Sequence, residues 1–314
     1  MLEINTIEAF QGLPGNHQTE ILKALRTKDR LDKFLLSQNK RRTDEPTEAH
    51  WKECSKCKPF WEKAQGQRGY VWIPAKRDDN DIHPSQIHKC LKVLYYSCSG
   101  RTAEMEEFIE PVLRRIFDIG SAWHIVMQDW YGRKGAWCDP ADYHPEVAID
   151  PDAVTFDGKP ALSIAERYWI RGHVDAVIDR YICENVPGIG DVSVRVVHEY
   201  KTMKESTYQH LNSPSPDHKK QATMYSAVFN VPIAVYMYLN KNTSQMADFP
   251  LPFDYSLWRD ITTKIDRVQE LVNNEQEPPW EETSAVKNQA ECRECGFRKI
   301  CNPPLSQIQT RRTA

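Results

Sequence analysis

Two segments rich in β-branched residues, joined by a short polar loop, constrain the fold of this chain more than any other feature. The first covers residues 172–179, the second covers residues 192–202, and the loop between them contains Asn, Pro, Gly and Asp. β-branched residues favour strands and these loop residues favour turns. The stretch therefore predicts two neighbouring strands of one sheet.

Charged side chains stand at the end of this predicted strand pair. Side chains alternate between the two faces of a strand, so Glu199 and Lys201 share a face, while Asp175 lies on the partner strand. Two carboxylates on adjacent strands can bind a divalent cation through oxygen, and a lysine beside them can position a water molecule or offset charge on a phosphate. A pair of strands with a surface ion pair would show the same spacing, so both interpretations stay open on this pattern alone.

Size and charge narrow the class of protein. The 314 residues are enough for one large or two modest domains, and the hydrophobic share of 40% is compatible with a packed core. The net charge of −3 neither favours nor excludes nucleic acid, because binding needs a local basic patch rather than a basic total. No apolar run reaches the length of a membrane span, and the N-terminus lacks the features of a signal peptide. We expect a soluble, intracellular (cytoplasmic) protein with no membrane partner.

The cysteines indicate bound metal. Nine cysteines in a chain without an export signal favour metal or cluster ligation over disulfide bonds. Cys292, Cys295 and Cys301 lie close together and are followed by a proline, a pattern typical of ligands. Cys54 and Cys57 form half of a tetrahedral zinc site, with His50 as a candidate third ligand, and two reduced thiols in a turn are the alternative.

The remaining elements follow from periodicity and capping. Helical spacing is expected within residues 108–130, after Asp217 and after Asp254, the last two being candidate N-caps. Strands are expected at residues 147–149, 168–170 and 233–239. We expect three parts: an N-terminal extension of unknown role over residues 1–80, a main domain over 81–303, and a polar tail over 304–314. His124 lies in the first helical stretch, where a lone histidine is usually a core residue.

In chain order, these motifs resemble the RecB-like branch of the PD-(D/E)xK nucleases, and within it the iron–sulfur CRISPR-associated and AddB-type exonucleases. That branch has a helical Gly-x-x-x-His, a Gly-x-x-Asp strand, a Glu-x-Lys strand and a Gln-x-x-x-Tyr helix. The matching residues are Gly120 and His124, Gly172 and Asp175, Glu199 and Lys201, and Gln221 and Tyr225. The likeness covers residues 83–303 and leaves residues 1–80 uncovered. The proline of the family name is absent here, since His173-Val174 precedes Asp175.

The resemblance extends to the cysteines. The iron–sulfur members use one cysteine ahead of the nuclease core and three behind it. Cys90 matches the first, and Cys292, Cys295 and Cys301 match the trailing three. The resemblance thus implies a 4Fe–4S cluster that joins the N- and C-terminal parts of the nuclease domain. A zinc-binding interaction protein is the alternative.

The family also implies a fold, a site and an activity. The fold would be α/β and restriction-endonuclease-like, with a mixed sheet flanked by helices. The activity would be metal-dependent hydrolysis of phosphodiester bonds in DNA, with an exonuclease acting on single strands or DNA ends as the favoured type. The alternative is a catalytically inactive DNA-binding protein with the nuclease fold. The implied site has catalytic Asp175, Glu199 and Lys201; Mg²⁺ or Mn²⁺ on His124, Asp175 and Glu199; and Gln221 and Tyr225 supporting Lys201 and contacting the DNA backbone. Glu146 and Glu166, expected on strands before Asp175, are further acidic candidates.

Overall fold

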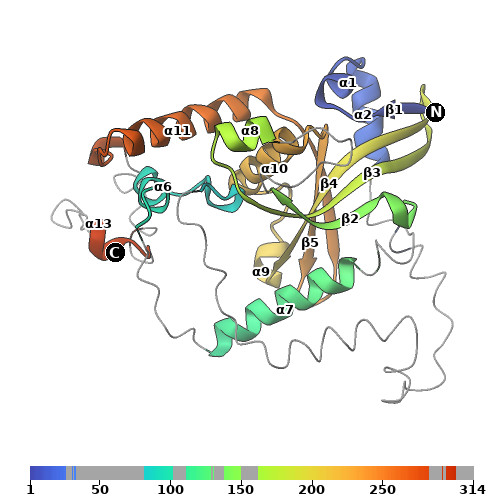
Figure 1. Cartoon of the computed structure of the whole chain (residues 1–314). Coiled ribbons are helices and arrows are strands. Elements are labelled where there is room, and N and C mark those ends of the chain that lie inside the picture. The colour runs from blue at the N-terminus through green and yellow to red at the C-terminus, as the bar shows by residue number, and fades with distance from the viewer. Residues whose placement is uncertain are drawn as a thin grey trace, which may run out of the picture.

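The centre of the molecule is a six-stranded mixed sheet with helices on both sides (Figure 1). The computed structural model describes residues 1–25, 30, 32, 81–101, 111–128, 130, 138–149, 162–282, 292 and 295–301. Five strands run in the order β2-β3-β4-β5-β6, and β1 pairs with β4 off this path. The expected α/β class with a mixed sheet flanked by helices is confirmed.

The strand pair predicted from the β-branched segments forms the middle of the sheet as β3 and β4, which are antiparallel. β4 pairs in parallel with β5 and with β1, whereas β2 with β3 and β5 with β6 are antiparallel. The strand bounds are β1 (Leu2–Ile4), β2 (Tyr143–Ile149), β3 (Gly172–Val186), β4 (Gly190–Met203), β5 (Ile233–Asn240) and β6 (Met246–Pro252).

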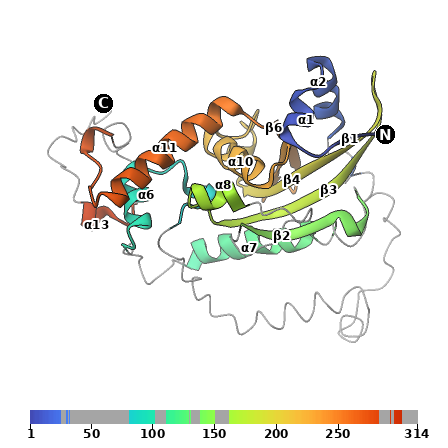
Figure 2. The same cartoon turned by 45° about the horizontal axis from the view of Figure 1, so that its top comes forward.

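Helices cover the two faces of the sheet. In both views α7 lies on one side and α8 and α10 lie on the other, while α6 and α13 lie together near the end of α11 (Figures 1 and 2). The helix bounds are α1 (Ile7–Gln11), α2 (Gly15–Ala24), α6 (Leu91–Cys98), α7 (Pro111–Gln128), α8 (Leu162–Arg167), α9 (Glu205–Tyr208), α10 (Pro216–Phe229), α11 (Tyr255–Asn273) and α13 (Arg298–Cys301), with 3-10 turns at Pro84–Gln86, Pro140–Asp142 and Trp280–Glu282. Within the described ranges, none of the helices combines the length and apolar character needed to cross a membrane.

Two of the predicted helix starts can be compared with the structure. Asp254 caps α11, because its Oδ1 accepts the backbone N–H of Leu257 at 3.0 Å. The expected cap at Asp217 is wrong. Ser215 caps α10 instead, accepting the N–H of His218 at 3.2 Å, and Pro216 occupies the first helical position. A proline fits that position because the N–H group of the first helical residue makes no hydrogen bond within the helix, so its absence costs nothing.

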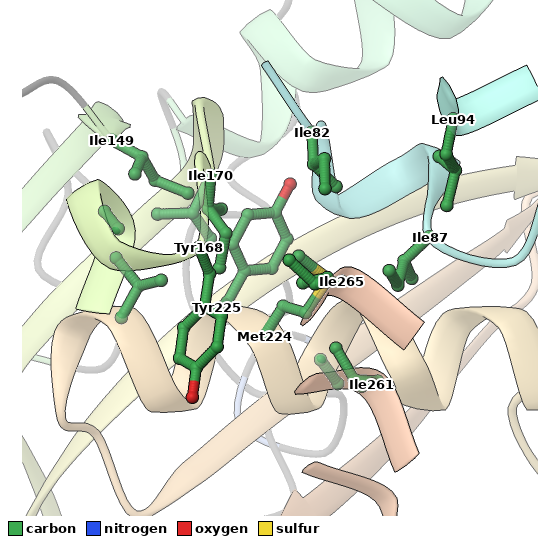
Figure 3. Close-up of a cluster of buried hydrophobic side chains, with 14 of the residues drawn as sticks. Ile82, Ile87, Leu94, Ile149, Tyr168, Ile170, Met224, Tyr225, Ile261 and Ile265 are labelled. Atoms are coloured by element: carbon green, nitrogen blue, oxygen red, sulfur yellow. The ribbon is translucent and has the colours of Figure 1, made fainter. Parts of the chain in front are cut away.

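Two large hydrophobic clusters hold the sheet to its helices. The larger joins α6, α8, α10 and α11 to one face, and Figure 3 shows Met224 and Tyr225 of α10 beside Ile261 and Ile265 of α11. The second cluster includes Ile178 of β3 together with residues of α1, α2 and α7. Burying each large aliphatic side chain stabilises the fold by about 1.5–3 kcal/mol, so these clusters fix the positions of the helices that reach the site.

Residues 1–25 pack on the central sheet. Leu2 pairs with Val192 and Ile4 with Val194. Ile4, Phe10, Ile21 and Leu25 are buried in the second cluster. His50, Cys54 and Cys57 lie outside the described residues, as does the expected tail at 304–314.

The strand expected at residues 168–170 is also wrong. α8 ends at Arg167, Trp169 adopts a left-handed φ of 52°, and Ile170 makes only an isolated bridge to Ile82. The bridge leads directly to Gly172 at the start of β3. A Cβ on Gly172 would lie 3.3 Å from Pro84 Cδ at a φ of +150°, so this glycine permits the close approach.

Candidate metal centre

The sheet brings Asp175 and Glu199 together, because β3 begins and β4 ends at the same end of the sheet. Ala176 pairs with His198, so this antiparallel register places Asp175 opposite Glu199. The Tyr200 backbone N–H donates to Asp175 Oδ2 at 2.6 Å. Lys201 Nζ donates to Glu199 Oε1 at 2.6 Å. The three residues expected to be catalytic thus lie on two adjoining strands within one group of charges.

His124 reaches the same group from α7. Its Nδ1 lies 3.0 Å from Asp175 Oδ1, and its side chain keeps 32% of its surface exposed. Burial alone would lower the pKa of His124, but the hydrogen bond with Asp175 and the negative charges of Asp175 and Glu199 outweigh it and raise the pKa. This histidine therefore faces a carboxylate rather than the apolar core.

Glu146 of β2 is the acidic residue that joins the site. Pro145 pairs with Ala176 and Val147 with Val174, so Glu146 lies beside Asp175 across the strand boundary. Its backbone has a left-handed φ of 52°, a conformation that costs about 1–3 kcal/mol and is concentrated at functional sites. Gln128 Nε2 donates to Glu146 Oε1 at 2.5 Å.

Glu166, the other acidic candidate, is exposed on α8 rather than on a strand. One ligand atom each from His124, Glu146 and Asp175 lies within 4.8 Å of the other two. The group therefore has the donor types and the spacing to bind a divalent cation.

The burial and charge environment of Glu199 is a second observation that is consistent with a bound cation at this site. Among the residues that the structure describes, its Oε2 is buried and has no hydrogen-bond partner. Burial, followed by the negative charge of Asp175, raises the pKa of Glu199 to about 7. Gathering these carboxylates in a buried place is unfavourable unless positive charge compensates them. Mg²⁺ and Mn²⁺, which prefer oxygen and imidazole ligands, match this need.

Gln221 and Tyr225 of α10 hold the carboxylate in place. Gln221 Nε2 donates to Glu199 Oε1 at 3.1 Å and to the Tyr225 hydroxyl at 3.1 Å. The Tyr225 hydroxyl in turn donates to the His173 carbonyl of β3 at 2.8 Å. Both side chains are buried, so the structure favours a supporting role over contact with a DNA backbone.

Of the four cysteines expected as cluster ligands, one precedes α6, two precede α13 and one ends α13. Cys90 immediately precedes α6, Cys301 ends α13, and all four are partly buried. Burial raises the pKa of the Cys301 thiol to about 11; the Lys92 charge opposes this rise, and Cys90, Cys295 and Cys292 add to it. Cys90 is far from the others in sequence, but α6, which follows it, packs against the trailing segment through the rings of Tyr96 and Phe297, whose centres are 5.5 Å apart.

Comparison with known proteins adds little. No family model matches the chain. No curated protein matches it. A solved structure titled "Crystal structure of SSO0001" is similar at 19% identity and a TM-score of 0.39, covering 77% of this chain and 92% of that one.

The alkaline exonuclease LHK-Exo from Laribacter hongkongensis is similar at 12% identity and a TM-score of 0.38. The structure of the same exonuclease in complex with dAMP is similar at 13% identity and a TM-score of 0.39. Each of these two comparisons covers 63% of this chain and 90% of the exonuclease chain. Likenesses at these identities and TM-scores carry no conclusion about this chain.

Proposed function

We propose that this protein is a metal-dependent DNA nuclease that hydrolyses phosphodiester bonds, as its resemblance to the RecB-like PD-(D/E)xK nucleases implies. The observation that carries the proposal is the grouping of His124, Glu146 and Asp175 within 4.8 Å, beside the ion pair of Glu199 and Lys201. When bound, Mg²⁺ or Mn²⁺ would stabilise negative charge on a phosphate and ease the deprotonation of a water molecule.

The protein's own residues supply position and charge. Lys201 is 25% exposed and is held by Glu199, so its ammonium is available to a water molecule or a phosphate oxygen. The Tyr200 N–H fixes Asp175, and Gln221 fixes Glu199. Groups held in this way need little rearrangement during the reaction, which is what makes electrostatic stabilisation effective.

The substrate we propose is single-stranded DNA or the ends of duplexes, cut by an exonuclease. Digestion of end-labelled linear DNA, beside a closed single-stranded circle of the same sequence, tests this. An exonuclease degrades the linear strand and leaves the circle intact. Cutting of the circle would show an endonuclease, and intact linear DNA in Mg²⁺ and in Mn²⁺ would leave only a DNA-binding role.

Replacing Glu146 with glutamine is expected to weaken Mn²⁺ binding by at least about 10-fold, since loss even of an outer partner commonly costs 10–100-fold. The carboxylate would lose its charge while the hydrogen bond from Gln128 is kept. Calorimetric titration of the protein with Mn²⁺ measures the affinity. Glu166→Gln is the matched control, because Glu166 is exposed on α8 and should leave the affinity unchanged. Equal affinities in the two variants would exclude Glu146 as a ligand.

Tyr225→Phe is expected to lower the cleavage rate to the same extent on substrates of different sequence. The change removes the hydroxyl that links Gln221 to the His173 carbonyl, and each buried hydrogen bond contributes about 1 kcal/mol. Rates on several labelled oligonucleotides, with a thermal unfolding curve, measure both effects. A change in sequence preference would point to contact with bases and contradict the supporting role.

We also propose that Cys90, Cys292, Cys295 and Cys301 hold a 4Fe–4S cluster. The spacing of the trailing cysteines and the packing of α6 against the segment that carries them support this proposal. Thiolate is the ligand that such clusters use. By joining α6 to α13, the cluster would fasten the two ends of the nuclease domain and have a structural role rather than a part in cleavage.

A further inference from the structure

A buried lysine stands beside the cysteine group. Lys92 is two residues after Cys90, in the first turn of α6, and its side chain is only 5% exposed. Its Nζ lies 2.5 Å from Glu277 Oε1 and 4.0 Å from the centre of the Trp280 ring. Burying an ammonium is costly unless it is paired, so its presence calls for a physical reason.

The partners of Lys92 belong to the other side of the same junction. In the sequence, Glu277 and Trp280 lie between the end of α11 and the trailing cysteines. Glu277 is 185 residues away from Lys92 along the chain. The Tyr96 hydroxyl donates to the same oxygen of Glu277. Burial alone would raise the pKa of Glu277, but the hydrogen bonds from Lys92 and Tyr96 lower it, so the carboxylate stays charged.

This ion pair and the cysteines form one structural unit. The centres of the Tyr96 and Phe297 rings are 5.5 Å apart. Phe297 is buried, and it lies between Cys295 and Cys301 in the sequence. Lys92 therefore lies where the helix that follows Cys90 meets the segment with the trailing cysteines. Four thiolates and their cluster carry net negative charge, and charge near a cluster shifts its reduction potential.

We propose that the positive charge of Lys92 compensates the negative charge of the cluster, and that the negative charge of Glu277 partly neutralises Lys92 and so weakens this compensation. This inference rests on the cluster of the proposed function. Lys92 and Glu277 act as positioning and charge-tuning residues and are not ligands. One-electron reduction of the cluster by an added reductant increases its negative charge, so removal of Lys92 disfavours reduction and removal of the Glu277 charge favours it.

The test is the reduction potential of anaerobically purified protein, followed by visible absorbance during titration with dithionite. Lys92→Met is expected to shift the potential to more negative values, and Glu277→Gln to more positive values. The double variant carries neither charge and should return close to the wild type. Tyr96→Phe removes the hydrogen bond to Glu277 without changing charge, so we expect no shift.

Lys23→Met is the control for net charge. Lys23 forms an exposed pair with Glu20 on α2, which lies away from α6 and α13 in both views (Figures 1 and 2), and its removal should leave the potential unchanged. If Lys92→Met alone yields no soluble protein, the difference in reduction potential between Glu277→Gln and the double variant measures the effect of the Lys92 charge.

Shifts of the same sign in Lys92→Met and Glu277→Gln, or no shift in either, would overturn the inference while the cluster stands. A colourless wild-type protein without iron would overturn the cluster and this inference together. Neither result would bear on the nuclease site, whose test is separate.

Discussion

Replacing Lys201 with methionine is expected to lower DNA cleavage by about 100-fold or more, the effect of losing one group that stabilises charge in a transition state. The methionine keeps much of the apolar stem but removes the ammonium that Glu199 holds at 2.6 Å. Lys201 is partly exposed and outside the hydrophobic clusters, so the variant should fold normally. Initial rates on labelled DNA in saturating Mn²⁺, with circular dichroism of the same sample, measure both properties.

The control for this change is Lys23→Met, which removes an exposed lysine on α2 and should cut at the wild-type rate. A Lys201→Met protein that cut as fast as the wild type would remove the lysine from the mechanism. A variant that lost activity together with its fold would say nothing about chemistry, which is why the spectrum is recorded on the same sample.

Replacing Cys295 with alanine is expected to remove the brown colour and the iron, to lower the temperature of unfolding and to reduce soluble yield. A cluster that is absent from the unfolded state contributes its binding free energy to folding. It also closes the long loop between Cys90 and the trailing cysteines, which restricts the unfolded chain. Iron analysis, the visible spectrum and a thermal melt of anaerobically purified protein measure these changes.

Cys98→Ala is the matched control, because Cys98 lies on α6 but is buried among apolar residues. Only 5% of its surface is exposed and its neighbours belong to the larger hydrophobic cluster, so we expect it to pack against them rather than to bind iron. This variant should keep its iron and lose only packing. Colour that survives Cys295→Ala, or zinc in place of iron in the wild type, would contradict the cluster and favour the zinc interpretation.

Local patterns predicted the parts of the site that depend on local geometry. The alternation along residues 197–201 placed Glu199 and Lys201 on one face, and the pair is in contact in the structure. The β-branched composition predicted β3 and β4, and Asp254 predicted the start of α11. Such features depend on backbone periodicity and capping, which neighbouring residues largely determine.

Long-range pairings could not be predicted in this way. Which of Glu146 and Glu166 joins the site depends on the register of β2 against β3 and on a left-handed backbone at Glu146. β1 joins the sheet beside β4 although a long stretch of chain separates them. At α10 the deciding signal was present, since Pro216 favours the first helical position and therefore Ser215 as the cap.

The central claim is most directly tested by incubating wild-type protein and Asp175→Asn with end-labelled single-stranded DNA, in Mn²⁺, in Mg²⁺ and in excess chelator. Asparagine keeps the size of Asp175 but removes the charge that His124 and the Tyr200 N–H contact. We expect the wild type to degrade the DNA only when a divalent cation is present, and Asp175→Asn to bind the DNA without cutting it. Wild-type protein that binds DNA but leaves it intact in both cations, or an Asp175→Asn protein that cuts at the wild-type rate, would contradict the account.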